Sequence, residues 1–263
     1  MGRIIGVLSG KGGVGKTVIC AGLGQAISNF QKSVCLIDFD FGLNNLDLML
    51  GIENQVVYDA LDYLSGHARL RQAIVQCGDA QNLYFLSTQK IKTFSTIDQN
   101  TLMSMIKKLG EVFDFVIIDG PAGFNDTTRF MTSVCDEIML IVTPGIASVR
   151  DASSIASELY KLNIDARLIV NRVRGDLVIK NASLNEKQIE SMLNIKLVGV
   201  IPEIGAINVY SNVKPVYGVC QEAKNAFNIL AKNIISNKVQ LVDYSSKFKG
   251  FIGAIKRKMI ENL

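Results

Sequence analysis

A glycine-rich loop near the start of the chain holds the residues with the most specific chemistry. An apolar strand pattern leads into the run Ser9-Gly10-Lys11-Gly12-Gly13-Val14-Gly15-Lys16-Thr17, and a helical pattern follows it. The G-x-x-x-x-G-K-[ST] spacing is typical of a loop whose backbone N–H groups wrap phosphates. We expect this loop, together with Val18, to bind a nucleoside triphosphate, and ATP is the expected substrate.

Two side chains at the end of this loop suit phosphate and metal chemistry. Lys16 is placed to reach the β- and γ-phosphates, and the Thr17 hydroxyl is placed to ligate Mg²⁺. Mg²⁺ takes few protein oxygens and completes its shell with phosphate oxygens and water. The loop therefore predicts a Mg²⁺-dependent ATPase in which Lys16 is catalytic.

Carboxylates close two further strand patterns. Asp38 and Asp40 end one of them, and Asp119 ends another. In a parallel sheet these strand ends meet at the edge where ligands bind. We expect Asp119 to hold Mg²⁺ directly or through water and Asp38 to contact Mg²⁺ or support the loop. Asp40 is expected to be catalytic by orienting the attacking water.

Apolar runs that suit strands alternate with longer helical patterns. The predicted strands are residues 3–8, Ser33–Asp38, Leu83–Ser87, Phe113–Asp119, Glu137–Thr143, Arg167–Asn171 and Lys196–Ile201. Several are apolar nearly throughout, which favours a parallel sheet buried on both faces. The helical patterns include Thr17–Phe30, Gln99–Leu109, Ala147–Tyr160 and Gln221–Ser236. The alternation predicts an α/β fold with a doubly wound, mainly parallel β-sheet flanked by helices.

The basic excess of the chain is confined to its end. Residues 245–263 contain five basic residues and one acidic residue, whereas the remainder has 23 of each. An α-helix turns by about 100° per residue. If the tail is helical, its apolar side chains lie within about 60° of one line along the helix. These side chains are Phe248, Phe251, Ile252, Ile255, Met259 and Leu263. Lysines such as Lys256 border the stripe, as in helices that lie on anionic lipid.

The composition divides the chain into three expected segments. They are a nucleotide-binding domain at residues 1–236, a polar linker at 237–246 and an amphipathic membrane-targeting helix at 247–263. One tail alone is expected to bind weakly, because ordering a backbone costs ~1–2 kcal/mol per residue. Two tails on a dimer would bind together and gain ~10²–10⁴ in avidity.

Other chemistries find little support. The five cysteines lie far apart, and His67 is the single histidine, so we expect buried thiols and no histidine-based metal site or catalytic triad. The first residues lack a signal-peptide pattern, and no run of 18 apolar residues is present. A cytoplasmic protein is therefore expected.

An additional lysine inside the loop, Lys11, is followed along the chain by further motifs. They are Asp38–Leu48, Val56–Asp59, Ser148–Asp151 and Lys196–Glu203. With the tail, these motifs resemble the MinD family of deviant Walker A (P-loop) ATPases, and the resemblance runs from end to end. It implies a slow ATPase that forms an ATP-dependent homodimer and positions the division-septum inhibitor MinC. It also implies that Lys11 crosses the dimer interface, where a cation stabilises the transferring phosphoryl group.

The resemblance implies roles for single residues elsewhere. Asn171, followed by Arg172, resembles the residue that reads the adenine edge, and Pro202 resembles the wall beside the base. Asn45 resembles a switch residue near the nucleotide and the interface. Asp151 resembles a residue that binds MinC.

Three positions depart from the family pattern. Val18 replaces a second threonine, Asn44 stands where an arginine is often found, and Gly120 replaces a serine. These departures bear on the hydrolysis rate and on partner affinity rather than on nucleotide binding.

Three other functions stay open at this point. A ParA-type DNA-segregation ATPase would need a basic patch on the body, whose formal charge is zero, so no specific nucleic acid is expected. A flagellar-placement ATPase usually carries an N-terminal extension, whereas here a strand pattern begins at Arg3. A structural polymer with MinC would not hydrolyse ATP usefully. The favoured interpretation is the MinD-type switch, with MinE or a functionally similar regulator as a further partner. The protein is then expected to bind reversibly, as a peripheral protein, to the inner face of the cell membrane.

Overall fold

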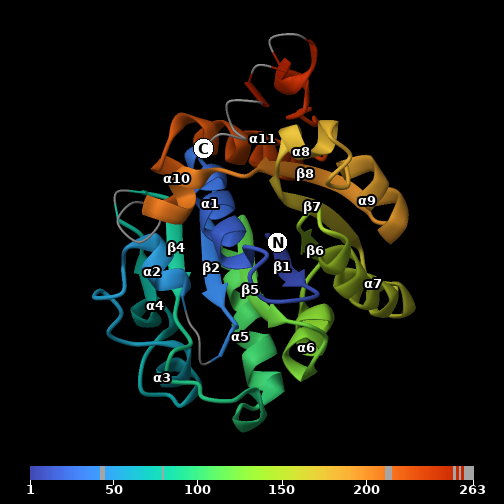
Figure 1. The fold of residues 1–263 in the computed structure, drawn as a ribbon. Helices are drawn as coiled ribbons and strands as arrows, with labels where there is room; N and C mark the ends of the chain where they lie inside the picture. The colour runs from blue at the N-terminus through green and yellow to red at the C-terminus, as the bar shows by residue number, and fades with distance from the viewer. Residues whose placement is uncertain (42–44, 79, 211–214, 251–252, 255, 258–263) are drawn as a thin grey trace.

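A mainly parallel sheet forms the centre of the protein (Figure 1). The computed structural model describes residues 1–41, 45–78, 80–210, 215–250, 253–254 and 256–257. Across these residues the strand order is β3-β4-β2-β5-β1-β6-β7-β8, and only the β3–β4 pair is antiparallel. The strands are β1 (Arg3–Ser9), β2 (Val34–Asp38), β3 (Ile74–Gln76), β4 (Leu83–Leu86), β5 (Phe115–Ala122), β6 (Glu137–Val142), β7 (Ala166–Val173) and β8 (Lys196–Pro202).

Helices cover both faces of this sheet. One layer contains α1 (Lys16–Asn29), α2 (Leu46–Leu50), α10 (Gly205–Tyr210) and α11 (Gln221–Ser236), and the other contains α5 (Gln99–Val112), α6 (Asp126–Val134), α7 (Ile146–Lys161) and α9 (Glu186–Leu193). Shorter turns are α3 (Ala60–Leu64), α4 (Leu70–Ala73), α8 (Gly175–Ile179), η1 (Phe94–Thr96), η2 (Val216–Gly218) and η3 (Ser246–Phe248). Alternate strand residues face the two layers, so each layer closes its own apolar core.

The predicted doubly wound α/β fold is confirmed. Every predicted strand is present, and α1, α5, α7 and α11 lie within three residues of the predicted bounds. The prediction missed the edge strand β3, whose three residues are partly or fully exposed and offer no apolar run. It also named neither α6 nor α9, which are short helices of nine and eight residues.

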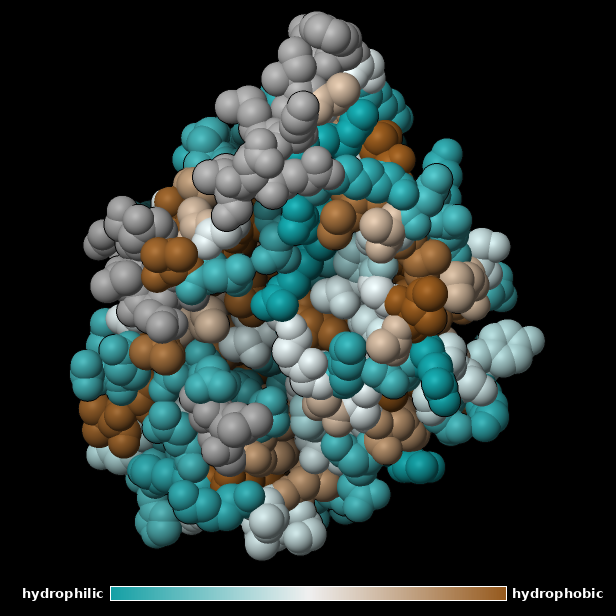
Figure 2. Space-filling view, viewed as in Figure 1, coloured by the Kyte–Doolittle hydropathy of each residue, from teal (hydrophilic) through white to brown (hydrophobic). Residues whose placement is uncertain are grey.

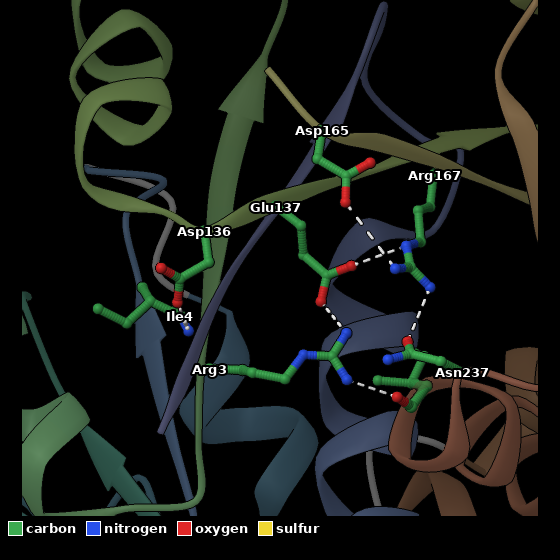
Figure 3. A network of polar contacts seen from close by, with 8 residues as sticks. Arg3, Ile4, Asp136, Glu137, Asp165, Arg167 and Asn237 are labelled. Carbon is green, nitrogen blue, oxygen red and sulfur yellow. Dashed lines mark hydrogen bonds and ion pairs between the residues drawn. The ribbon is translucent and has the colours of Figure 1, made fainter. Parts of the chain in front are cut away.

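A buried ionic network ties the end of α11 to the amino edge of the sheet (Figure 3). Glu137 is 3% exposed and pairs with Arg3, and its Oε2 lies 3.0 Å from Arg167 Nε. Arg3 Nη1 donates to the Ile234 carbonyl at 2.5 Å, and Arg167 Nη1 donates to Asn237 Oδ1 at 3.1 Å. Cations at a helix C-terminus satisfy its last carbonyls. The network therefore fixes the point from which the C-terminal segment departs.

The C-terminal segment lies against the body rather than forming a free linker. Asn233 Nδ2 donates to the Gln240 carbonyl at 2.8 Å, and the Gln240 N–H donates to Asn233 Oδ1 at 2.9 Å. Tyr244 is half-buried against the core, and its backbone approaches Gly175 at the start of α8. Backbone pairing to a buried amide explains how a polar stretch is held in place.

Candidate functional site

The phosphate loop leaves the carboxyl end of β1 and enters α1 at Lys16. Gly15 takes the left-handed conformation at φ 93°, where a side chain would be strained. A Cβ there would also lie 2.5 Å from Asn171 Nδ2, which donates to the Val14 carbonyl at 2.8 Å. The loop is therefore braced from β7, and the first N–H groups of α1 remain available for an anion.

Helix α7 packs directly on this loop. A Cβ on Gly10 would lie 2.3 Å from the Asp151 carbonyl carbon and 2.5 Å from the Ala152 nitrogen. Only glycine permits so close an approach. Asp151, predicted from the family resemblance to bind a partner protein, is half-buried on α7. The predicted partner site and the phosphate loop thus share a backbone contact.

The two loop lysines differ in their surroundings. Lys16 is 7% exposed, and its charge opposes the rise in the pKa of both Asp40 and Asp119. Lys11 is half-buried, and its ammonium has no ion pair or hydrogen bond with any residue that the structure describes. Ser9 Oγ donates to the Lys11 carbonyl at 2.8 Å and holds the loop turn. Lys16 therefore lies among the carboxylates of its own chain, and the predicted role of Lys11 across a dimer interface stays a prediction.

Two buried carboxylates lie side by side at the end of the sheet. Asp38 pairs in register with Asp119 across β2 and β5, and each is 1% exposed. Asp38 accepts hydrogen bonds from the Asp40 N–H at 2.9 Å and the Leu46 N–H at 3.2 Å. Burial, and then the charge of Asp119, raises the pKa of Asp38 to about 7. Burial raises the pKa of Asp119 to about 6.

The donor set at this edge fits Mg²⁺. Both carboxylate oxygens of Asp119 are buried without a hydrogen-bond partner among the described residues. An uncompensated buried carboxylate is costly unless a cation or a donor faces it. Thr17 stands in the first turn of α1 beside this carboxylate, and its hydroxyl lowers the pKa of Asp119. One or two carboxylates with a hydroxyl and water are what Mg²⁺ takes next to phosphates.

Asp40 is the most open of the three carboxylates. Its side chain is half-buried, and burial raises its pKa while the charge of Lys16 opposes that rise. Asp40 thus lies within the influence of the Lys16 charge, and its role in orienting water stays a prediction. Asn45 is exposed at the N-cap of α2, and Asn44 lies outside the described residues.

A narrow cavity lies beside the loop where the base was predicted to bind. Asn171, Arg172 and Pro202 line it together with Gly15 and Val18. Sequence reasoning gave no role to the remaining lining residues, Glu203, Ile204, Ile207 and Asn208. All four belong to the turn and helix α10 after β8, and only the fold brings that segment next to the loop. The cavity holds about 20 Å³, so a base must displace side chains to enter.

A polar bridge closes this cavity. Arg172 takes a left-handed backbone conformation at φ 58°, and its Nε lies 3.9 Å from Glu203 Oε2. Asn208 Nδ2 donates to Glu203 Oε1 at 3.1 Å. The side-chain amide of Asn171 donates to the Val14 carbonyl of the loop. Holding the loop is therefore a role of Asn171 that the sequence did not predict, beside its predicted contact with the base.

The departure at Gly120 has a packing cause. A Cβ at this position would lie 2.7 Å from Leu8 Cδ2 and 2.7 Å from Met131 Sδ. Met131 is fully buried on α6, so the long thioether takes the space that a side chain at residue 120 would need. The glycine and the methionine are therefore matched to each other. The departure at Val18 changes the lining of the base cavity.

The prediction of a continuous tail helix from residue 247 is wrong at its start. Ser246–Phe248 form a 3-10 turn, Lys249 is extended, and Gly250 has φ 69°. Phe248 was assigned to the lipid-facing stripe, but it is 8% exposed and lies in η3, which contacts α8. A Cβ on Gly253 would lie 2.2 Å from the Phe248 carbonyl carbon, so the two segments stack closely. The left-handed glycine breaks the helix that the apolar spacing predicted.

The remainder of the tail is described only in part. Lys247 Nζ lies 3.2 Å from Glu222 Oε1, and Lys249 Nζ lies 2.9 Å from Asp243 Oδ2. Lys256 is helical and exposed, as predicted for a residue that faces lipid head groups. The predicted lipid-facing residues Phe251, Ile252, Ile255 and Met259 lie outside the described residues. Among the described residues, no helix has the length and apolar character needed to cross a bilayer.

Comparisons with known proteins agree with this geometry. Residues 5–216 match the model of the CobQ/CobB/MinD/ParA nucleotide binding domain. The chain is 36% identical to the septum site-determining protein MinD of Thermotoga maritima, over 97% of each chain. It also resembles the MinD structure in the MinC:MinD cell division protein complex of Aquifex aeolicus, with a TM-score of 0.83 and 29% identity. That match covers 91% of this chain and 98% of the other.

A further solved relative contains the expected ligands. It is the septum site-determining protein MinD of Pyrococcus horikoshii complexed with Mg-ADP, with a TM-score of 0.78 and 28% identity. The match covers 89% of this chain and 96% of that one. The fold of this chain agrees with the folds of these relatives. The chain belongs to the MinD family of septum site-determining ATPases, within the CobQ/CobB/MinD/ParA nucleotide-binding group.

Proposed function

We propose that this chain is an ATP-driven dimerising switch that places a MinC-type division inhibitor on an anionic membrane. Membership of the MinD family makes it a Mg²⁺-dependent ATPase of cell-division site selection. The observation that supports the switch most directly is Lys11. It stands on the phosphate loop, half-buried, with an ammonium that pairs with none of the residues that the structure describes.

The residues of one chain supply most of the hydrolytic machinery. The loop N–H groups and Lys16 bind the phosphates, and Thr17, Asp38 and Asp119 would hold Mg²⁺, which neutralises phosphate charge. Asp40 orients the water that attacks the γ-phosphate. Lys11 of a second copy completes the site, since a cation supplied in trans stabilises the transferring phosphoryl group. Hydrolysis in this scheme requires the dimer, which couples turnover to assembly.

Exposed apolar side chains support an interface on the nucleotide face. Leu48, Val57, Ile146 and Val209 are 39%, 72%, 71% and 65% exposed, and each follows the carboxyl end of a strand. Figure 2 shows such apolar side chains among polar ones on the face that carries α2 and α10. Exposed apolar groups near a site are typical of a surface that a partner covers. A second copy of the chain suits this face, because its Lys11 would then reach the phosphates.

Partner proteins would bind to α7, and the tail would bind to anionic lipid. The Aquifex relative forms a complex with MinC. In the present chain the backbone of Asp151 contacts Gly10 of the phosphate loop. A MinC-type partner or a MinE-like regulator bound to α7 would therefore respond to the conformation of the loop. The exposed Lys256 and the other tail lysines favour anionic lipid. The protein would then be peripheral on the inner face of the membrane when ATP is bound.

Light scattering tests the dimer. The Asp40→Ala variant is expected to bind ATP with a low residual turnover and to show a dimeric mass with ATP and Mg²⁺. With ADP the same variant is expected to be monomeric, because ADP lacks the γ-phosphate that Lys11 of the second copy would contact. An equal mass with both nucleotides would contradict the proposal.

The distribution of charge disfavours the alternative of a DNA-segregation ATPase. The basic residues exceed the acidic ones only in residues 245–263. A salt-dependent DNA shift by a protein lacking this tail would favour that role.

A further inference from the structure

Four phenylalanine rings form a closed circuit next to Asp40. Phe39 and Phe41, on either side of Asp40, have ring centroids 5.2 Å apart. Phe41 stacks on Phe94 at 6.2 Å with an interplanar angle of 19°, and Phe39 stacks on Phe130 at 6.4 Å and 29°. Phe94 and Phe130 complete the circuit at 5.4 Å. Aromatic contacts of this kind are worth more than their buried area alone.

Burial of three of the rings and two hydrogen bonds donated by the main chain hold the circuit in place. Phe39, Phe94 and Phe130 are 0%, 9% and 5% exposed. The Phe39 N–H donates to the Asp119 carbonyl at 2.7 Å, and the Asp40 N–H donates to Asp38 Oδ1 at 2.9 Å. Both neighbours of Asp40 are thus held by rings, and one bond to the Asp119 main-chain carbonyl and one to the Asp38 carboxylate tie the segment to the two predicted metal ligands. The Asp40 side chain is left as the part that is half-buried and free to face the phosphates.

We propose that Phe94 and Phe130 are positioning residues for hydrolysis and act by holding the Phe39–Phe41 segment so that Asp40 faces the attacking water. This inference rests on the proposed role of Asp40. Neither ring lines the cavity beside the phosphate loop. Phe94 comes from the turn after β4 and Phe130 from α6, so the circuit joins Asp40 to the helix that follows the Asp119 strand. A displacement of about 1 Å at a reacting group can cost 10²-fold in rate.

The test measures kcat for ATP hydrolysis and the Kd for ATP in Phe94→Leu and Phe130→Leu. Leucine keeps an apolar side chain and removes the ring. We expect kcat to fall by about 10-fold to 100-fold, while the Kd for ATP stays within about threefold because the phosphate loop is untouched. Phe94→Tyr keeps the ring and is expected to restore kcat, since Phe94 borders an open cleft of about 720 Å³ that can take a hydroxyl.

Phe113→Leu is the matched control. Phe113 is 7% exposed and pairs with Tyr84 at 5.2 Å in the same core, but it lies before the amino end of β5, away from Asp40. All three leucine variants are expected to lose a similar amount of thermal stability. Only Phe94→Leu and Phe130→Leu are expected to lose kcat. An equal loss of kcat in Phe113→Leu would show a general packing effect and overturn the positioning role.

A double-mutant cycle separates this inference from the function on which it rests. If the rings act through Asp40, adding Phe94→Leu to Asp40→Ala causes no further loss of turnover. An additive loss would overturn the inference. Wild-type turnover in Phe94→Leu beside an inactive Asp40→Ala would overturn the positioning role alone. Wild-type turnover in Asp40→Ala would overturn the role of Asp40, and the inference with it.

Discussion

Replacing Lys11 with alanine is expected to lower ATP turnover by about 10³-fold or more, the effect of removing a cation supplied in trans. The variant is expected to bind ATP as a monomer with an affinity within a few-fold of wild type, because Lys16 and the loop N–H groups remain. Turnover is measured at saturating ATP, and nucleotide affinity is measured separately on the monomer.

Two controls sharpen this result. Lys16→Ala is expected to lose nucleotide affinity itself, since Lys16 is buried beside the strand-end carboxylates. Mixing Lys11→Ala with a wild-type-loop Asp40→Ala chain is expected to restore turnover at one of the two sites, because each variant supplies what the other lacks. Turnover by Lys11→Ala within about threefold of wild type, well inside the expected loss, would contradict the proposed action in trans.

Replacing Asp119 with asparagine is expected to lower turnover strongly and to stabilise the nucleotide-free protein. Loss of a metal ligand removes several kcal/mol of charge stabilisation, about 10²-fold to 10³-fold in turnover. The same change removes a buried carboxylate, and burial disfavours its charged form enough to raise the pKa of Asp119 to about 6. Function and stability therefore oppose each other at this position, as at other functional sites.

The pH dependence of unfolding tests the stability half of this prediction. Burial raises the native pKa of Asp38 to about 7 and of Asp119 to about 6, whereas unfolded aspartates titrate near 3.8. Between these values the native state binds more protons, so stability falls as pH rises from about 4 to about 7. In EDTA, wild type is expected to melt higher at pH 6 than at pH 8. Asp119→Asn is expected to flatten that difference and to raise the pH 8 Tm by several degrees.

Asp114→Asn is the control with the opposite sign. Its carboxylate accepts from the Ser33 N–H at 2.8 Å, and this hydrogen bond lowers the pKa of Asp114. Its contribution is present above the unfolded pKa and is lost as pH falls through the lowered native value. The variant is expected to melt slightly below wild type at pH 8. If Asp119→Asn melts below wild type at pH 8, the proposal that the buried Asp119 carboxylate destabilises the nucleotide-free protein is contradicted.

The sequence predicted the parts of the site that are local in the chain. The loop Gly10–Thr17 carries its own spacing, and the strands that end at Asp38 and Asp119 are apolar runs that a buried parallel sheet requires. The register that places those two carboxylates side by side follows from the sheet, and the sequence supported only the expectation that strand ends converge.

Contacts between distant segments could not be predicted in the same way. Asn171 braces the loop across 157 positions, and Met131 fills the space left by Gly120. The ring circuit joins residues 39–41 to Phe94 and Phe130. Each of these depends on which elements pack together, and no residue pattern within one element contains that information.

The tail shows the limit of periodicity. Apolar spacing placed Phe248 on a lipid-facing stripe, but spacing does not record the left-handed Gly250 or the burial of Phe248. The lipid-binding surface is therefore expected to begin after Gly250. Under the proposed switch, lipid binding by the remainder is expected to depend on the dimer, since two tails together would gain ~10²–10⁴ in avidity.

Vesicle co-sedimentation tests the membrane switch most directly. The full chain and a chain lacking residues 245–263 are each mixed with anionic vesicles in ATP or ADP, with Mg²⁺. The account predicts that the full chain sediments with the vesicles in ATP and stays in solution in ADP, and that the truncated chain stays in solution in both. Equal sedimentation of the full chain in ATP and ADP, or tail-independent sedimentation in ATP, would contradict it.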